Sequence, residues 1–155
     1  MNLFDKKPCL GLVVSNRAFF NPALALEGRH EIISILDSLG FSYVIQDEKA
    51  TSSGCVENYR DAQLLAEELK KHRDEIDGIA VILPTFGDEI TVTETIRLSG
   101  LDVPILVQAC NDEPDKVDVK SRRDAFCGKI AVCNNLFQYG IPFTDTSFHT
   151  CHLSS

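Results

Sequence analysis

The sequence predicts an α/β protein in which a parallel sheet lies between two layers of helices. Continuous apolar runs without polar alternation recur along the chain, and segments with apolar residues at three- and four-residue spacing separate them. Such runs are typical of strands buried on both faces of a parallel sheet, and their regular alternation with helices is typical of three-layer domains. We therefore expect right-handed crossovers and a flavodoxin-like (Rossmann-like) topology with the strand order 2-1-3-4-5.

The first strand and helix have clear boundaries. The run 9–14 is a buried strand, and Asn21 can cap a helix whose first turn begins at Pro22 and which Gly40 ends. Gly28 is expected where this helix approaches the sheet closely. The apolar face predicted for the helix contains Leu24, Gly28, Ile32, Ile35, Leu36 and Leu39.

The middle of the chain repeats the pattern. A second strand is predicted at 41–46, a second helix follows the capping residue Asn58, and a third strand runs over 78–83. The stretch "DEITVTETIRLSG" is ambiguous because its β-branched residues also suit a strand. Its context favours a helix, since Asp88 can cap it, Gly100 can end it, and a buried strand at 104–109 follows within a few residues.

A last helix is predicted before Gly140, because Phe126, Ile130, Cys133 and Phe137 repeat at helical spacing. Its other face is nearly uncharged, whereas a peripheral helix usually shows solvated charges. We expect something else to cover that face, so that the helix is an interface element. The residues predicted to form this interface are Cys127, Ala131, Asn134 and Asn135.

Length, charge and cysteine content restrict the class of protein. The 155 residues fit one domain spanning 1–155, and 23 acidic against 15 basic residues give a formal net charge of −8. The basic residues form only isolated pairs, the apolar run near the amino terminus is too short for a signal peptide or a membrane span, and the six cysteines include no C-x-x-C pair. We expect a cytoplasmic protein with no nucleic-acid or membrane partner.

Several common chemistries lack their motifs. The turn after the first strand reads "SNRAFF", so it has no glycine-rich cradle for a dinucleotide, and neither a Walker A pattern nor a G-x-S-x-G elbow occurs. The only close histidine pair, His149 and His152, is more simply interpreted as part of a surface tail than as a metal site. The acidic run 112–115 is more simply a solvated turn. The sequence therefore predicts no metal site and no cofactor within this chain.

The best candidate residues follow the ends of the predicted strands, where parallel sheets gather their ligands. These amides, rings, hydroxyl and guanidinium can bind neutral hydroxyl groups and the apolar face of a sugar or polyol, but they include no evident base or nucleophile. Loop capping and packing is an equal alternative for each, and Arg17 could instead pair with Asp88 or Glu89. The candidates are Asn16, Arg17, Phe19, Thr85, Phe86 and Gln108.

With these segments in place, the sequence resembles the amino-terminal domain of the L-fucose and L-arabinose isomerase superfamily, particularly its fucose-isomerase-like members. The resemblance covers nearly the whole chain. It rests on the ordered combination of "GLVVSNRAFF", "HRDEIDGIAVILPTFGDE", "LDVPILVQA" with "NDEP", and "RRDAFCGKIAVCNNLFQYGIPFT" running to "HT".

The resemblance implies an aldose–ketose isomerase that works on a divalent ion, usually Mn²⁺, held by residues of later domains. It implies that this chain supplies substrate-side residues and subunit contacts in a homo-oligomer, that further domains follow Ser155, and that the isolated chain is inactive. A free-standing flavodoxin-like module, with a small-molecule binding or interaction role and no catalysis, remains the alternative. The sugar itself is not specified.

Overall fold

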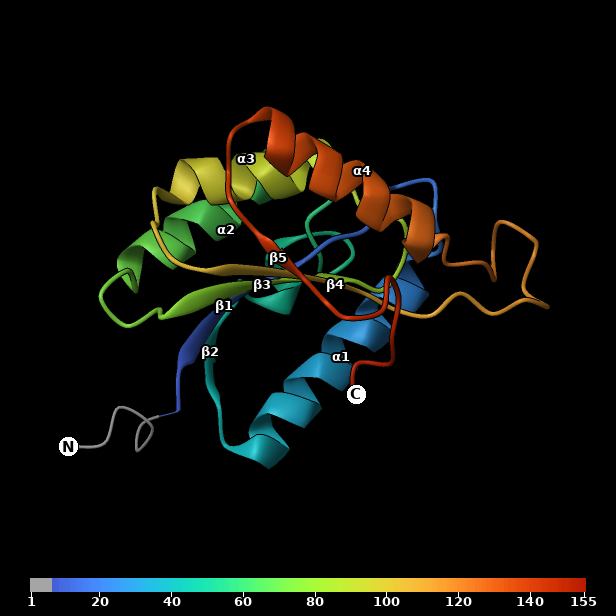
Figure 1. Ribbon diagram of the computed structural model, residues 1–155, viewed down its shortest axis with the longest axis horizontal. Coiled ribbons are helices and arrows are strands. Elements are labelled where there is room, and N and C mark those ends of the chain that lie inside the picture. Colours follow the sequence, from blue (N-terminus) through green and yellow to red (C-terminus); the bar gives the residue numbers. More distant parts are fainter. Residues whose placement is uncertain (1–6) are drawn as a thin grey trace.

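A computed structural model of the chain, which describes residues 7–155, contains a five-stranded, entirely parallel sheet (Figure 1). The strand order is β2-β1-β3-β4-β5, so the predicted fold class and order 2-1-3-4-5 are confirmed. Residues 1–6 of the amino-terminal stretch inspected for a signal peptide lie outside the described residues. The strands are β1 (Cys9–Val14), β2 (Ser42–Val44), β3 (Gly78–Leu83), β4 (Ile105–Ala109) and β5 (Thr144–Asp145).

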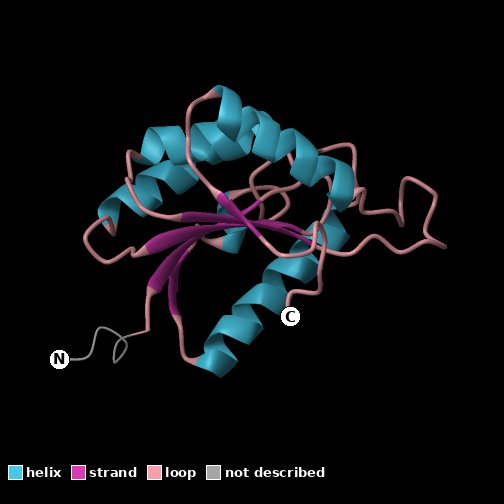
Figure 2. Cartoon of the chain, viewed as in Figure 1, coloured by secondary structure: helices cyan, strands magenta, loops and turns pink. Residues whose placement is uncertain are grey.

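Helices cover the two faces of the sheet unequally. Three of them lie together on one face and α1 lies on the other (Figures 1 and 2). None of the helices in the described residues is long and apolar enough to cross a membrane. The helices are α1 (Pro22–Leu39), α2 (Tyr59–Lys71), α3 (Glu89–Ser99) and α4 (Ala125–Gln138), with a short 3₁₀ turn, η1 (Glu48–Ala50), after β2.

The predicted helix boundaries are confirmed by their caps. The side chains of Asn21, Asn58 and Asp88 each accept a hydrogen bond from a backbone N–H in the first turn of the following helix. Gly40 and Gly100 end α1 and α3 in the left-handed conformation, which a residue without Cβ adopts most easily. The ambiguous stretch after β3 is helical, as its context predicted.

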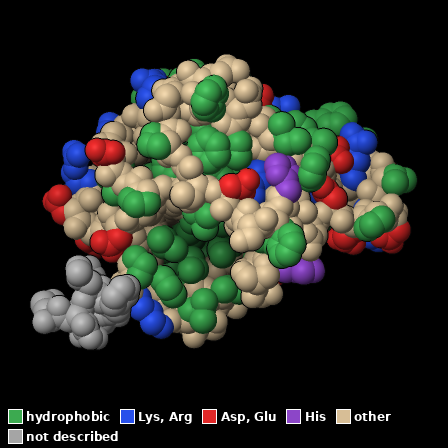
Figure 3. Space-filling model, viewed as in Figure 1, with side chains coloured by type: hydrophobic (Ala, Val, Ile, Leu, Met, Phe, Trp, Pro, Cys, Tyr) green, Lys and Arg blue, Asp and Glu red, His purple; other side chains and the backbone are tan. Residues whose placement is uncertain are grey.

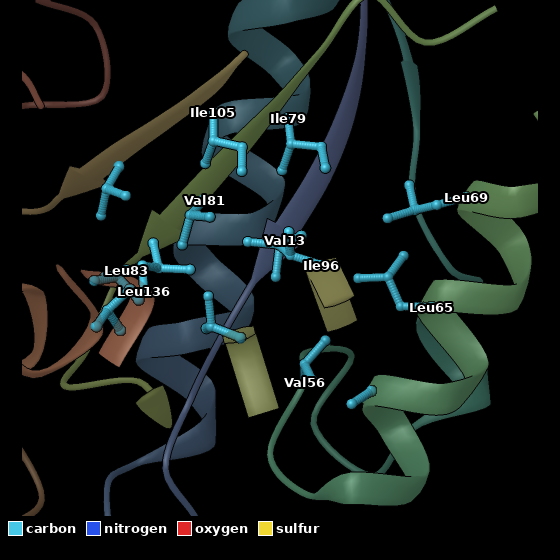
Figure 4. Close-up of a cluster of buried hydrophobic side chains, with 14 of the residues drawn as sticks. Val13, Val56, Leu65, Leu69, Ile79, Val81, Leu83, Ile96, Ile105 and Leu136 are labelled. Carbon is cyan, nitrogen blue, oxygen red and sulfur yellow. The ribbon is translucent and has the colours of Figure 1, made fainter. Parts of the chain in front are cut away.

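The larger hydrophobic core lies between the sheet and α2, α3 and α4 (Figure 4). In this core Val13 of β1, Val81 of β3 and Val107 of β4 are fully buried beside Leu65 of α2 and Leu136 of α4. A smaller core on the opposite face joins β1 and β3 to α1. The two cores fix the strands in register, so β1, β3 and β4 end at the same edge of the sheet.

The orientation predicted for the last helix was wrong. Its buried face contains Ala125, Gly128, Lys129, Val132 and Leu136. Phe126, Ile130 and Phe137, which share the spacing that predicted the core, are 46%, 50% and 77% exposed. Only Cys133, the fourth residue of that set, packs partly buried against the core. Two apolar stripes run along α4, and the one with larger side chains faces outward. Hydropathy alone selected the wrong stripe because Lys129 occupies a buried position.

Lys129 is fully buried because it has local partners. Its ammonium group pairs with Asp145 and donates a 2.7 Å hydrogen bond to Thr146 Oγ1. The α1 face also departs from the prediction, since Arg29 is buried and Leu39 is exposed. Arg29 donates 2.8 Å hydrogen bonds to the carbonyl oxygens of Gln46 and Gly54, so it ties α1 to the loop after β2.

Candidate functional site

The loops after β1 and β3 build an aromatic wall at the carboxyl edge of the sheet. Phe86 stacks on Phe20 with ring centroids 5.8 Å apart and planes 15° apart, and Phe19 meets Phe20 edge-on at 5.5 Å. Phe20 is buried, whereas Phe19 is 62% exposed. The structure therefore gathers predicted site residues from two loops around Phe20, which sequence reasoning missed although it stands next to Phe19.

Arg17 lies against this wall. Its guanidinium carbon is 4.5 Å from the centroid of the Phe86 ring, within the range of a cation–π contact. The same guanidinium pairs with Glu89, and its Nε lies 3.8 Å from Asp88 Oδ2. The ion pair considered as an alternative for Arg17 is thus present. The ion pair leaves Nε buried without a hydrogen-bond partner, and about one-third of the side chain remains exposed.

Asn16 and Thr85 lie beneath the wall and are fully buried. Thr85 Oγ1 donates a 2.5 Å hydrogen bond to Asn16 Oδ1, and Asn16 Nδ2 donates one of 2.5 Å to Glu57 Oε1. This chain of hydrogen bonds joins the ends of β1 and β3 to the start of α2. The geometry assigns Asn16 and Thr85 to holding the loops in place rather than to the exposed surface.

Two helical glycines clamp the loop that carries Phe86. A Cβ on Gly28 of α1 would lie 2.5 Å from Pro84 Cβ, and a Cβ on Gly128 of α4 would lie 1.7 Å from the carbonyl oxygen of Phe86. Real Cβ atoms do not approach that closely, so both helices reach the loop only because these positions lack side chains. The predicted close approach at Gly28 is confirmed, and Gly128 adds a second one.

Gln108 is separate from this group. Its register partner on β3 is Ile82, which belongs to the core on the α1 side. The amide nitrogen of Gln108 donates 2.9 Å hydrogen bonds to the carbonyl oxygens of Ala109 and Cys151. Its Oε1 is buried without a hydrogen-bond partner. Gln108 therefore holds the carboxyl-terminal segment of the described chain against β4.

Arg122 also reaches the wall, with its guanidinium carbon 5.8 Å from the Phe20 centroid, and it pairs with Asp124 at 3.1 Å. Its neighbour Arg123 donates a 3.0 Å hydrogen bond to the carbonyl oxygen of Pro84. These arginines come from the polar loop before α4. That loop has no hydropathy pattern, so nothing in the sequence indicated that it returns to the edge.

The nearby thiols are poor nucleophiles. Burial raises the pKa of the Cys110 thiol, just after β4, to about 11 and that of Cys55 to about 12. Thiols with such values are almost entirely protonated at neutral pH, whereas catalytic cysteines have lowered pKa values. Covalent catalysis by either residue is therefore disfavoured.

The residues present do not fit a divalent-metal centre. Between residues 7 and 155 no group of three or more His, Cys, Asp or Glu side chains is arranged to hold an ion. Asp88 and Glu89 pair with Arg17. The edge therefore offers aromatic rings, a guanidinium that is only partly used by its ion pair, and hydrogen-bonded amides. Such a set can bind and orient a polyol, but it includes no evident base or nucleophile to catalyse a reaction.

The chain matches a known protein family over most of its length. Residues 11–155 match the model of a protein family described as "Fucose/sulfoquinovose isomerase, N-terminal domain". No match was found among curated proteins. The matched residues include every strand and helix except the first two residues of β1.

Proposed function

Because this chain belongs to the fucose/sulfoquinovose isomerase N-terminal domain family, we propose that it is the first domain of a metal-dependent aldose–ketose sugar isomerase of the L-fucose and L-arabinose isomerase type. The family match over residues 11–155 is the observation that carries this proposal. We further propose that the enzyme is cytoplasmic. We also propose that domains beyond residue 155 hold Mn²⁺ or a similar divalent ion, because no ligand cluster exists in the described residues.

In this proposal the aromatic wall contacts the sugar. Phe19 and Phe86 offer ring faces to the apolar side of the substrate, and Arg17 offers guanidinium donors to its hydroxyl groups. Asn16 and Thr85 keep the two loops together from below. Gln108 contributes to the sugar site only indirectly, through the carboxyl-terminal segment that it holds against β4. None of these residues performs the proton transfer, which we assign to the other domains.

The outward face of α4 is proposed as the subunit contact of a homo-oligomer. The four residues predicted from the sequence lie at least partly exposed there, with Cys127 and Asn134 the more exposed. Phe126, Ile130 and Phe137 extend this face, and the only charged residue of the helix, Lys129, points inward. An uncharged face can meet its own copy without like-charge repulsion, even in a chain with a net charge of −8.

The experiment is a comparison of two purified proteins, the 155-residue chain and the native full-length polypeptide, whose extent is established by intact mass. Because the sugar is not specified, L-fucose, L-arabinose and sulfoquinovose are each assayed, and conversion of an aldose to its ketose should appear only with the full-length protein and only with the divalent ion. Turnover by the 155-residue chain, free of contaminating isomerase, would overturn the proposal that the other domains carry out catalysis. A native mass that ends at Ser155 would instead favour the free-standing binding module, which the lack of catalytic groups also suits.

A further inference from the structure

One face of the sheet is only partly covered. Within residues 7–155, helices α2, α3 and α4 pack on one face, whereas α1 is the only helix on the other (Figure 1). On the α1 side, Leu106 is 41% exposed although β4 lies between β3 and β5. Parallel sheets occur almost only where both faces are covered, so an exposed leucine on an interior strand marks a position where packing is missing.

The uncovered area is a groove of about 250 Å³. Figure 3 shows it as a hydrophobic hollow in the face of the molecule above α1. One charged side chain, Asp77, lines it, and its Oδ2 already accepts a 2.8 Å hydrogen bond from the backbone of Cys9. The apolar part of the lining comes from four consecutive strands and their approaches: Pro8, Leu10, Ala80, Pro104, Leu106 and the methyl-bearing Thr144.

We propose that this groove docks an amphipathic helix from the domains that follow this one in the full-length enzyme. The inference rests on the proposed function, because it needs those domains to exist. Strand β4 has five residues and is about 17 Å long, so a helix of about eleven residues, or three turns, would span it. Such a helix would cover Leu106 and complete the second helical layer.

The path of the chain after β5 is consistent with this occupant. The segment after β5 returns to the carboxyl end of β4, where Cys151 N–H donates a 3.0 Å hydrogen bond to the carbonyl oxygen of Ala109. Leu153 is then buried in the core on the α1 side, together with Leu12 and Val14. The chain has thus already crossed to the α1 side, next to the carboxyl end of the groove. A helix that continues from this anchor and runs antiparallel to β4 enters the groove directly.

Crossover handedness supports the same occupant. The α1 connection leads from β1 towards β2, whereas the connections through α2, α3 and α4 lead in the opposite direction across the sheet. Because crossovers are right-handed, the connection through α1 lies on one face of the sheet, and the connections through α2, α3 and α4 lie on the opposite face. No connection among β1–β5 can therefore bring a second helix to the α1 side. A helix over Leu106 would therefore come from outside these connections.

The test measures the accessibility of the groove with and without the other domains. Leu106→Cys and Leu64→Cys are made in both the 155-residue chain and the full-length protein, and modification by iodoacetamide is followed at each introduced cysteine by peptide mass spectrometry. Leu64 of α2 is a matched control, since it is 39% exposed and lies on the other face of the domain. Thr144→Cys is a second reporter in the lining of the groove, on β5 beside its register partner Leu106, in case Leu106→Cys fails to fold.

We expect the groove reporter to react at least about tenfold more slowly in the full-length protein than in the 155-residue chain, because a docked helix must open before the thiol is exposed. The Leu64→Cys rate should differ by less than about twofold. Equal reactivity of both groove reporters in an active full-length isomerase would overturn the docking while leaving the function intact. Equal protection of Leu64→Cys would also overturn it. Groove protection in a full-length protein that lacks isomerase activity would support the docking and refute the function.

Discussion

The guanidinium of Arg17 contacts both the Phe86 ring, whose centroid is 4.5 Å away, and the carboxylate of Glu89, with which it forms an ion pair. A residue of the loop after β1 is thereby fixed by a ring from the loop after β3 and by the first residue of α3. Its side chain is still about one-third exposed. Arg17 is consequently oriented before any ligand arrives, and its exposed part rather than its buried Nε is what a ligand at this edge would meet.

The first prediction concerns Arg17→Ala in the full-length enzyme. It should raise KM or lower kcat/KM by roughly tenfold or more, as expected for the loss of a contact worth about 1.5–3 kcal/mol, with the bound metal unchanged. Steady-state kinetics and metal analysis check both. Arg97→Ala is the control, since Arg97 also pairs with a glutamate, Glu94, but on the far turn of α3. Unchanged kinetics with a lower Tm would show that Arg17 serves only its ion pair.

Gly128→Ala is predicted to destabilise the chain by about 2 kcal/mol or more, although alanine is the better helix former. The added methyl group would overlap the carbonyl oxygen of Phe86, a backbone atom that cannot rotate away. Urea unfolding measures the change. Asn134→Ala, at an exposed position of the same helix, should be neutral or slightly stabilising. If both substitutions stabilise the protein, α4 does not grip the loop as described.

Thr85→Val tests the buried hydrogen bonds under the wall. The substitution keeps the shape of the side chain but removes its hydroxyl, which leaves Asn16 Oδ1 without its 2.5 Å donor. A loss of about 1–3 kcal/mol in the free energy of unfolding is expected. Thr95→Val is a matched control, because Thr95 is equally buried and donates only to the carbonyl oxygen of Thr91 within its own helix. Comparable costs for the two variants would argue against a special role for the Asn16–Thr85 pair.

The pH dependence of stability should reveal the buried thiol of Cys55. Its pKa is raised from 9.0 to about 12, chiefly by burial, so above pH 9 the unfolded chain releases a proton that the folded chain retains. The stabilisation is complete below pH 9 and is lost as the pH rises towards 12. The stability of the wild type relative to Cys55→Ala should therefore decrease over this range in urea titrations.

The outward face of α4 gives a further prediction for the full-length protein. Ile130→Glu should lower the oligomeric state or its concentration dependence in analytical ultracentrifugation, because a charge would be buried at each proposed contact. Leu64→Glu introduces the same charge on α2 and should leave assembly unchanged. A monomeric wild-type enzyme, or an Ile130→Glu variant that assembles normally, would contradict the proposed subunit contact.

Local signals were sufficient to predict the architecture. Asn21, Asn58 and Asp88 each specify a helix start through one side-chain hydrogen bond, and such contacts are readable from sequence. The inward face of α4 was not readable, because Lys129 is stabilised by Asp145 and Thr146, which lie in a segment after the helix. Burial of a charge depends on such distant partners, and the spacing of apolar residues does not report them.

The candidate site shows the same limit. The parallel-sheet rule correctly brought the loop of Arg17 and the loop of Phe86 to one edge. It could not distinguish an exposed ring such as Phe19 from a buried hydroxyl such as Thr85, because strand position does not determine side-chain exposure. Arg122 was missed because only the folded path of an irregular loop brings it to the wall.

The glycine clamp on the loop after β3 has a thermodynamic consequence for ligand binding. Pro84 and the Phe86 carbonyl are held by helices from opposite layers of the domain, so the loop cannot leave the edge unless one layer separates from the sheet. Loops that become ordered only when a ligand arrives weaken its affinity by the conformational entropy they lose. Here that entropy is already lost when the chain folds. A ligand at Phe86 therefore meets a rigid surface, and stabilising the fold by mutation should leave its affinity at this surface nearly unchanged.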